Sequence, residues 1–234
     1  MRVTDLPIDE RVKHILVEEG VETLRPAQKK AVKAGLLEGK NLLVVTPTAS
    51  GKTLIAELGL VHHALQGRMG VYIAPLKALA AEKHALFQKR YAKLGLRIVM
   101  SIGDYDAPPR FIDRADILIV TSEKLDAMLR HDTRFAERIG IAIFDEIHLV
   151  HDPGRGPIVE MLATLLKGWG VQIIGLSATI GNPHELAAWL NAALVQDDWR
   201  PVMLERGIII PTDEGVELRV YARDGSTPSE DENE

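Results

Sequence analysis

Short apolar runs recur along the chain and alternate with longer amphipathic segments. Each run is rich in Val, Ile and Leu and lacks the strict alternation of a half-exposed strand, which is typical of strands buried on both faces of a parallel sheet. The predicted strands are Asn41–Val45, Gly70–Ala74, Arg97–Ser101, Asp116–Val120, Ile141–Asp145 and Val171–Ser177.

The segments between these runs have the apolar spacing of helices that cover one face of a sheet. They are Gly51–Leu65, Leu76–Leu94, Ser122–Arg130, Gly156–Lys167 and Pro183–Leu190. Strands that alternate with helices in this way predict the α/β class, with a three-layer, doubly wound and mostly parallel sheet. We assign residues 41–200 to this domain.

Both ends of the chain differ from this pattern. Residues 1–40 contain two predicted helices, Ile8–Glu19 and Pro26–Leu37, the second with a proline in its first turn. After the last helix the apolar runs become shorter, and we expect residues 201–223 to form accessory strands or an exit linker. The strands predicted there and just before are Ala192–Val195, Val202–Arg206 and Val216–Ala222. Residues 224–234 are polar and acidic, so we expect a disordered tail.

The composition excludes several classes of protein. There is no cysteine, so disulfides, Cys-ligated zinc and iron–sulfur clusters are excluded. No apolar run approaches the length of a membrane span, and we expect a cytoplasmic protein without a membrane partner. The net charge is −5, from 33 acidic and 28 basic residues. Five of the acidic residues lie in the tail, so the rest of the chain has 28 acidic residues and is neutral overall. A neutral body neither indicates nor excludes a nucleic-acid partner.

A candidate phosphate loop follows the first predicted strand. It ends in Ser-Gly-Lys-Thr, and the residues we expect around the phosphates are Thr48, Ala49, Ser50, Gly51, Lys52 and Thr53. In such a loop a glycine lets the backbone approach the phosphates, and the next helix points its N-terminal amides at them. The lysine contacts the β and γ phosphates, and the threonine hydroxyl binds Mg²⁺. The usual first glycine of this motif is replaced by Thr46. The alternative is an ordinary helix start.

A pair of acids, Asp145 and Glu146, closes the fifth predicted strand. Ligands of open α/β sheets bind beyond the carboxyl ends of the strands, where these two side chains would lie. We therefore assign Asp145 to magnesium and Glu146 to the activation of the attacking water, with Lys52 as the third catalytic residue. The alternative is that both acids only cap a loop. Together the two motifs predict a P-loop NTPase that uses ATP and Mg²⁺.

The sequence Asp-Glu-x-His at this place resembles motif II of the DExH-box superfamily 2 helicases, and other segments follow in that family's order. Leu24–Gln28 resembles the motif whose glutamine contacts adenine, which implies that role for Gln28. Ala74–Leu79 and Thr121–Lys124 resemble motifs Ia and Ib, and Ser177–Thr179 resembles motif III. The resemblance implies strand-binding roles for Pro75, Lys77, Thr121 and Ser122, and a role in coupling ATP to the strand for His148, Ser177 and Thr179.

Further segments are similar to the Ski-like branch of these helicases, including Arg155-Gly156-Pro157 and the run from Leu176 to Trp189. Within that branch the opening Leu6–Asp9 and the region 41–57 look most like the archaeal Hel/Hjm-type repair helicases. The resemblance covers about residues 1–210. Members of this family have two RecA-like domains with the nucleotide between them, and the arginine finger comes from the second.

The resemblance therefore implies the first motor domain of an ATP-dependent 3′–5′ DNA helicase that acts in DNA repair or at replication forks. We expect single-stranded or forked DNA and a second RecA-like domain as partners, and almost no turnover from this domain alone. An RNA helicase of the same branch and a stand-alone ATP-binding regulatory module are the alternatives. We expect the pair His62-His63 to lie on a helix surface, and Trp169, Trp189 and Trp199 to pack in the core.

Overall fold

Seven parallel strands form one sheet in the order β3-β4-β2-β5-β6-β1-β7. They are β1 (Leu42–Val45), β2 (Met69–Ala74), β3 (Ile98–Ser101), β4 (Ile117–Thr121), β5 (Ile139–Phe144), β6 (Gln172–Ser177) and β7 (Ala193–Gln196). Neighbouring strands are paired in parallel throughout, for example Val44 with Leu176 and Ile73 with Phe144. The predicted α/β class and doubly wound sheet are confirmed.

This computed structural model describes the chain except residues 104–108, 179, 202–205, 213–214 and 222–234. The chain divides into two units, Met1–Trp199 and Arg200–Glu234. Unit 1 contains the seven-stranded sheet and all the helices of the described residues. In unit 2 the described residues form an antiparallel hairpin of β8 (Arg206–Thr212) and β9 (Gly215–Tyr221).

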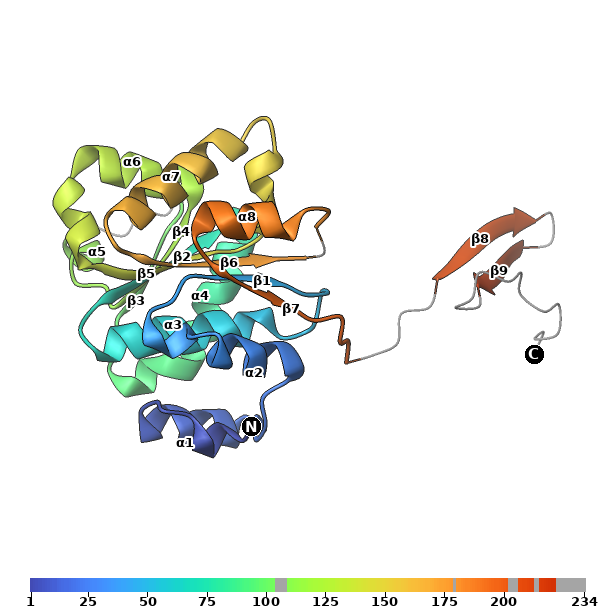
Figure 1. Ribbon diagram of the computed structural model, residues 1–234, viewed down its shortest axis with the longest axis horizontal. Coiled ribbons are helices and arrows are strands. Elements are labelled where there is room, and N and C mark those ends of the chain that lie inside the picture. Colours follow the sequence, from blue (N-terminus) through green and yellow to red (C-terminus); the bar gives the residue numbers. More distant parts are fainter. Residues whose placement is uncertain (104–108, 179, 202–205, 213–214, 222–234) are drawn as a thin grey trace. The chain divides into compact units, whose positions relative to one another are not determined.

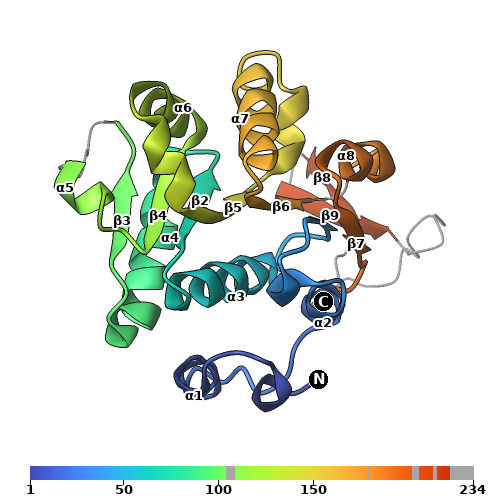
Figure 2. The same cartoon turned by 60° about the vertical axis from the view of Figure 1, so that its left-hand side comes forward.

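Helices cover both faces of the sheet (Figures 1 and 2). One face carries α2 (Pro26–Lys33), α3 (Lys52–Leu65) and α4 (Lys77–Tyr91), and α1 (Glu10–Glu18) lies outside these helices. The other carries α5 (Pro109–Ile112), α6 (Ser122–His131), α7 (Gly156–Gly168) and α8 (Pro183–Leu190). Residues along each strand alternate between the two layers: Val44 packs with the α3 face, whereas Leu43 and Val45 pack with the α7 face. These are the three predicted layers.

Local chemistry accounts for several helix boundaries. The carboxylate of Asp9 accepts a hydrogen bond from the amide of Arg11, so α1 starts at Glu10, two residues later than predicted. The helix predicted over Pro26–Leu37 instead ends at Lys33, because Gly35 adopts a left-handed conformation with φ of 103° and a short 3-10 helix, Leu36–Glu38, follows. The Thr121 hydroxyl caps α6 by accepting from the amide of Lys124.

The C-terminal strands differ from the prediction. Of the strand predicted over Val202–Arg206, residues 202–205 lie outside the described part of the chain, and β8 runs from Arg206 to Thr212. Pro211 lies within β8, where proline is tolerated because each strand of a two-stranded hairpin has an unpaired edge. The predicted tail, 224–234, also lies outside the described residues. Four short elements of the described residues were not predicted: α5 and the 3-10 helices Val3–Asp5, Thr133–Arg138 and Ile147–His151.

Candidate functional site

The loop between β1 and α3 has the shape that phosphate binding requires. Two of its residues have positive φ, Ala49 at 63° and Gly51 at 95°. A Cβ atom on Gly51 would lie 2.5 Å from Nε2 of Gln28, so the loop and α2 are in close contact at this glycine. Helix α3 begins immediately afterwards at Lys52, and its N-terminal amides face the loop. Thr48 is exposed and Thr53 is partly exposed in the first turn of α3.

Thr46, which replaces the usual first glycine of the motif, holds the two sides of the loop together. Its hydroxyl lies 2.7 Å from the hydroxyl of Ser50, and both side chains are buried. The amide of Thr46 donates to the carbonyl of Ser177 at the end of β6. The residue at this position therefore closes the loop through a side chain.

Lys52 bridges the loop and the end of β6. Its Nζ donates to the carbonyl of Thr46 at 2.9 Å and to the carbonyl of Ser177 at 3.0 Å. Burial lowers the pKa of this ammonium, while the nearby carboxylates of Glu146 and Asp145 act in the opposite direction. A cation that is partly desolvated and held by two carbonyls can exchange them for phosphate oxygens.

Gln28 lies against the phosphate loop from the side of α2. Its side chain is 3% exposed, Oε1 accepts from the amide of Arg25, and Nε2 donates to the carbonyl of Gly51 at 3.0 Å. Arg25 contacts the same loop, because its Nη1 donates to the carbonyl of Ala49 at 2.9 Å. Its guanidinium lies 5.4 Å from the ring centre of Trp199. Arg25 was not assigned a role from the sequence, although it belongs to the segment Leu24–Gln28 that suggested Gln28.

The acidic pair follows β5, and its first member is held by a tyrosine. The Tyr72 hydroxyl donates to Oδ2 of Asp145 at 2.5 Å, and the amide of Asp145 donates to the carbonyl of Ile73. Burial raises the pKa of Asp145, and the Tyr72 bond opposes that shift. Burial and the adjacent Asp145 also raise the pKa of Tyr72. Tyr72 was missed from the sequence, where the only signal is one hydroxyl-bearing residue inside an apolar strand.

Glu146 and Ser177 are joined through His148. Glu146 has a left-handed backbone with φ of 52°, uncommon for a residue with a side chain, and this turns the chain after β5. Nδ1 of His148 lies 3.1 Å from the Ser177 hydroxyl and 3.3 Å from Oε2 of Glu146. The structure thus brings together Lys52, Glu146, His148 and Ser177, which come from three separate segments of the sequence.

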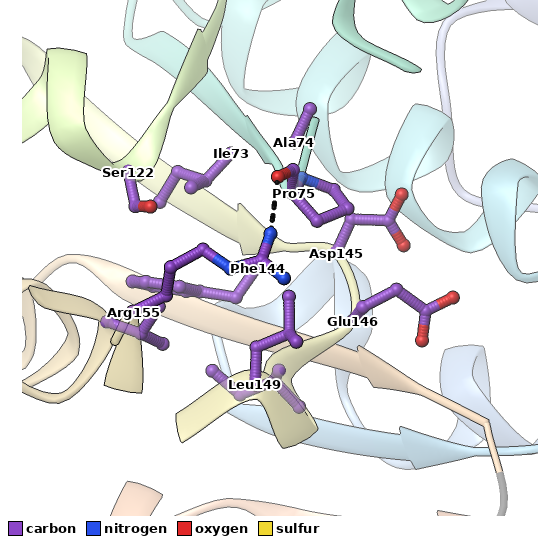
Figure 3. A pocket seen from close by; sticks show the side chains of 11 residues that line it. Ile73, Ala74, Pro75, Ser122, Phe144, Asp145, Glu146, Leu149 and Arg155 are labelled. Carbon is purple, nitrogen blue, oxygen red and sulfur yellow. Dashed lines mark hydrogen bonds between the residues drawn. The ribbon is translucent and has the colours of Figure 1, made fainter. Parts of the chain in front are cut away.

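The residues expected to bind the strand lie farther along the same edge of the sheet. The last residue of β2, Ala74, pairs with Thr121 of β4, so Pro75 and Ser122 follow two neighbouring strands. Both line a small pocket with Phe144 and Arg155 (Figure 3). Lys77 is exposed at the start of α4, whereas Thr121 and Ser122 are buried. Strands β5 and β6 separate this place from the phosphate loop after β1.

The comparisons with known proteins agree with this arrangement. The family model of the DEAD/DEAH box helicases matches residues 25–186. The chain belongs to the DEAD/DEAH box helicase family. The matched span contains the phosphate loop, the acidic pair and every expected strand-binding residue, and the predicted membership of the superfamily 2 helicases is confirmed.

Among curated relatives, the chain is 50% identical over 206 residues to the ATP-dependent DNA helicase Hel308 of Methanococcus vannielii, covering 85% of this chain and 27% of the relative. It is 49% identical over 209 residues to the Hel308 helicase of Pyrococcus abyssi, covering 89% of the chain and 29% of the relative. The chain therefore spans less than a third of the length of these relatives. These similarities confirm the resemblance to the Hel/Hjm type.

Solved structures show the same fold. The DUF1998 helicase MrfA bound to DNA is similar with a TM-score of 0.70 at 29% identity, covering 82% of this chain and 30% of that chain. MrfA bound to DNA and AMPPNP is similar with a TM-score of 0.71 at 27% identity, covering 92% of this chain and 31% of that one. The RecA-like α/β prediction is confirmed by this likeness. No helix of the described residues is long and apolar enough to cross a membrane.

The side-chain oxygens near the phosphate loop fit a magnesium ion that is bound mainly by the nucleotide. No group of three His, Cys, Asp or Glu side chains that could hold a metal occurs among the described residues. A P-loop site does not need one, since Mg²⁺ prefers one or two protein oxygens together with phosphates and water. The tyrosine bond to Oδ2 leaves Oδ1 of Asp145 for this purpose, with the Thr53 hydroxyl as the second protein donor.

Several predicted side-chain positions need correction. Thr179, expected to couple ATP to the strand, lies outside the described residues. His63 was expected at a surface but is buried, with Nε2 2.8 Å from Oε1 of Gln172, because α3 faces the sheet on that side. Trp169 and Trp199 were expected in the core but are 44% and 38% exposed, since both lie in the segments that follow a helix or strand.

Proposed function

We propose that this chain is the ATP-binding first motor domain of an ATP-dependent 3′–5′ DNA helicase that acts in DNA repair or at replication forks. The support for DNA and for ATP is the identity of about half the aligned residues with relatives named ATP-dependent DNA helicase. The polarity and the forked substrate are inferred from the family resemblance. The helicase would then work inside the cell on the DNA of the nucleoid.

The observation that carries the proposal is the continuous set of contacts from Lys52 through Ser177 and His148 to Glu146. When bound, Mg-ATP supplies a phosphoanhydride whose γ-phosphoryl group can be transferred to water. Lys52 exchanges its carbonyl partners for phosphate oxygens, and Thr53 and Asp145 hold the ion. Glu146 orients and deprotonates the water, with Oε2 making no hydrogen bond in this structure.

Adenine recognition by Gln28 requires a rearrangement of its present contacts. Both ends of the amide are bonded, to the amide of Arg25 and to the carbonyl of Gly51. The amide would therefore exchange one of these bonds for the adenine edge. This links base recognition to the shape of the phosphate loop, because Gly51 is the glycine that permits its left-handed turn.

A second RecA-like domain is proposed as the partner that completes the nucleotide site. Two-domain helicases place the arginine finger on the second domain, and such an arginine is worth about 10³–10⁵ in turnover. We therefore expect this chain alone to bind Mg-nucleotide weakly and to hydrolyse ATP very slowly. An RNA helicase remains the nearest alternative, since contacts to phosphate discriminate poorly between sugars.

The test is an ATPase and strand-binding comparison. The purified chain is measured with Mg-ATP, with and without single-stranded DNA or RNA of the same sequence, and again with a form that includes a second motor domain. We expect strand-stimulated hydrolysis only in the longer form, with DNA preferred. Tight nucleotide binding without any response to either nucleic acid in the longer form would favour the regulatory module. Full activity from the monomeric chain would contradict the one-domain assignment.

A further inference from the structure

Arg155 lies in a tight turn between the acidic pair and α7. Oδ1 of Asp152 accepts hydrogen bonds from the amides of Gly154 and Arg155, at 2.9 and 2.8 Å. Gly156 follows, and a Cβ atom at this position would collide with the carbonyl of Val150. The turn therefore fixes the backbone of Arg155, which explains the Arg-Gly-Pro segment that the sequence comparison with the Ski-like branch singled out without a role.

The side chain of Arg155 reaches the end of β2. Its Nη1 donates to the carbonyl of Pro75 at 3.0 Å, a residue 80 positions earlier in the chain. In Figure 3 the guanidinium lies beside Pro75 and on the side of Ser122, whereas the carboxylates of Asp145 and Glu146 point away from it. Arg155 thus belongs to the strand-binding side of the edge and not to the nucleotide side.

The end of the pocket at this guanidinium offers a cation and a hydroxyl, whereas Asp145 and Glu146, which also line the pocket, point their carboxylates away from it (Figure 3). Pro75 and Ser122 follow the paired strands β2 and β4, and Arg155 is the one cationic residue that lines the pocket between them among the described residues. A guanidinium has five N–H donors in a rigid plane, so one bond to a carbonyl leaves donors for a second acceptor. Arginine matches phosphate oxygens better than lysine because it can offer two parallel donors.

We propose that Arg155 is a phosphate-binding residue of the nucleic-acid site, with Nη1 held by Pro75 and the remaining donors on one phosphate between Pro75 and Ser122. This inference rests on the proposed function and adds to Lys77 a second cation, which lies outside motifs Ia and Ib. It also gives a physical link between the nucleic-acid site and the nucleotide site, since Arg155 and Glu146 belong to one short segment. A phosphate bound at Arg155 would fix the position of that segment.

The experiment is a salt titration of binding to fluorescently labelled single-stranded oligothymidylate, using the 234-residue chain. It compares the wild type with Arg155→Gln, Arg155→Lys and the control Arg130→Gln. Arg130 is an exposed arginine near the end of α6 that pairs with Asp126. Binding of Mg-ADP is measured on the same samples as a test of folding.

Arg155→Gln is expected to bind the strand more weakly and to flatten the slope of log affinity against log salt by about 0.7, the value for one phosphate contact on a single strand. Arg155→Lys retains the charge and is expected to keep the wild-type slope, as is Arg130→Gln. All variants should bind Mg-ADP equally.

An unchanged slope in Arg155→Gln, or an equal flattening in Arg155→Lys, would overturn the proposal, because Arg155 would then only position Pro75. If the wild type does not bind oligothymidylate, the proposed DNA-binding function itself fails, and this inference with it.

Discussion

The Tyr72 hydroxyl donates a 2.5 Å hydrogen bond to Oδ2 of Asp145, the carboxylate that we assign to magnesium. Tyr72 is 1% exposed, and its ring packs edge-on against Phe87 of α4 with 5.7 Å between ring centres. The ring therefore cannot turn away from the carboxylate. Hydrogen-bond partners that orient a metal ligand typically change metal affinity by about 10–100-fold when they are removed.

Replacing Tyr72 with Phe should therefore raise the concentration of Mg²⁺ needed for nucleotide binding, by roughly 10–100-fold. The substitution removes one oxygen and keeps the ring, so packing against Phe87 persists. Binding of a fluorescent ADP analogue is titrated with Mg²⁺, and affinity for the nucleotide without metal should not change.

Tyr91→Phe is the matched control for this experiment. Tyr91 is also buried, and its hydroxyl donates to Oε2 of Glu57 at 2.5 Å, away from the acidic pair. Its removal should lower stability without changing the Mg²⁺ dependence. Equal Mg²⁺ titrations for the wild type and Tyr72→Phe would show that the tyrosine only satisfies a buried carboxylate.

The roles of Glu146 and Lys52 can be separated in a form of the helicase that includes a second motor domain. Glu146→Gln should retain bound ATP, because the magnesium ligand Asp145 is intact, and turnover should fall by about 10²–10⁴ with the loss of the general base. Lys52→Ala should weaken binding and turnover together. Normal turnover in Glu146→Gln would show that the assigned base is wrong.

The parts of the fold that could be predicted follow from local patterns. Buried parallel strands leave continuous apolar runs, and residues at strand ends such as Pro75, Asp145 and Ser177 can be placed at one edge because all seven strands point the same way. The position of the hairpin β8–β9 was less predictable, since a two-stranded element buries little and leaves a weak pattern. The short helix α5 was also missed, because a helix of four residues leaves a similarly weak pattern.

The side-chain partners could not be predicted from the motifs. Tyr72 and Asp145 are joined only after β2 and β5 become neighbours, and Arg155 meets Pro75 only after α7 packs against β6. Each contact depends on a register or turn that no short sequence pattern records. The motifs therefore indicate which residues to assign to the nucleotide, but not the side chains that hold those residues in place.

Glu57 is expected to be the most sensitive buried charge in the helicase. It lies on α3 with a side chain that is 1% exposed, and it pairs with Arg90 at 2.5 Å, while Arg90 also pairs with Glu19 at the C-terminal cap of α1. Glu57→Ala should lower the free energy of unfolding by about 3–5 kcal/mol, because it leaves a partly buried arginine without its inner partner. Glu19→Ala, at the more exposed end of the same network, should cost less than about 1 kcal/mol. Urea unfolding measures both, and similar losses would contradict this ranking.

The same carboxylate should give the stability a measurable dependence on pH. Burial raises the pKa of Glu57 above its ordinary value of 4.5, although Arg90 and the Tyr91 hydroxyl act in the opposite direction. The folded state then binds this proton more tightly than the unfolded state. The stabilisation is complete below the unfolded pKa and is lost as pH rises through the folded pKa. The unfolding free energy of the wild type relative to Glu57→Gln should therefore fall as pH is raised from 4.5, and a constant difference would contradict the raised pKa.

Thr46 should stabilise the phosphate loop although it departs from the usual glycine. The positive φ values of this loop fall on Ala49 and Gly51, so residue 46 does not need the freedom of glycine. Its buried hydroxyl instead bonds to Ser50 at 2.7 Å.

Thr46→Gly removes that bond, worth about 1–3 kcal/mol when a buried partner is left unsatisfied, and adds conformational freedom to the loop. Affinity for Mg-ADP should fall by roughly tenfold, since about 1.4 kcal/mol corresponds to that factor. Thr46→Ser keeps the hydroxyl and should bind nearly as the wild type does. If Thr46→Gly binds Mg-ADP as tightly as Thr46→Ser does, the hydroxyl pair does not shape the loop.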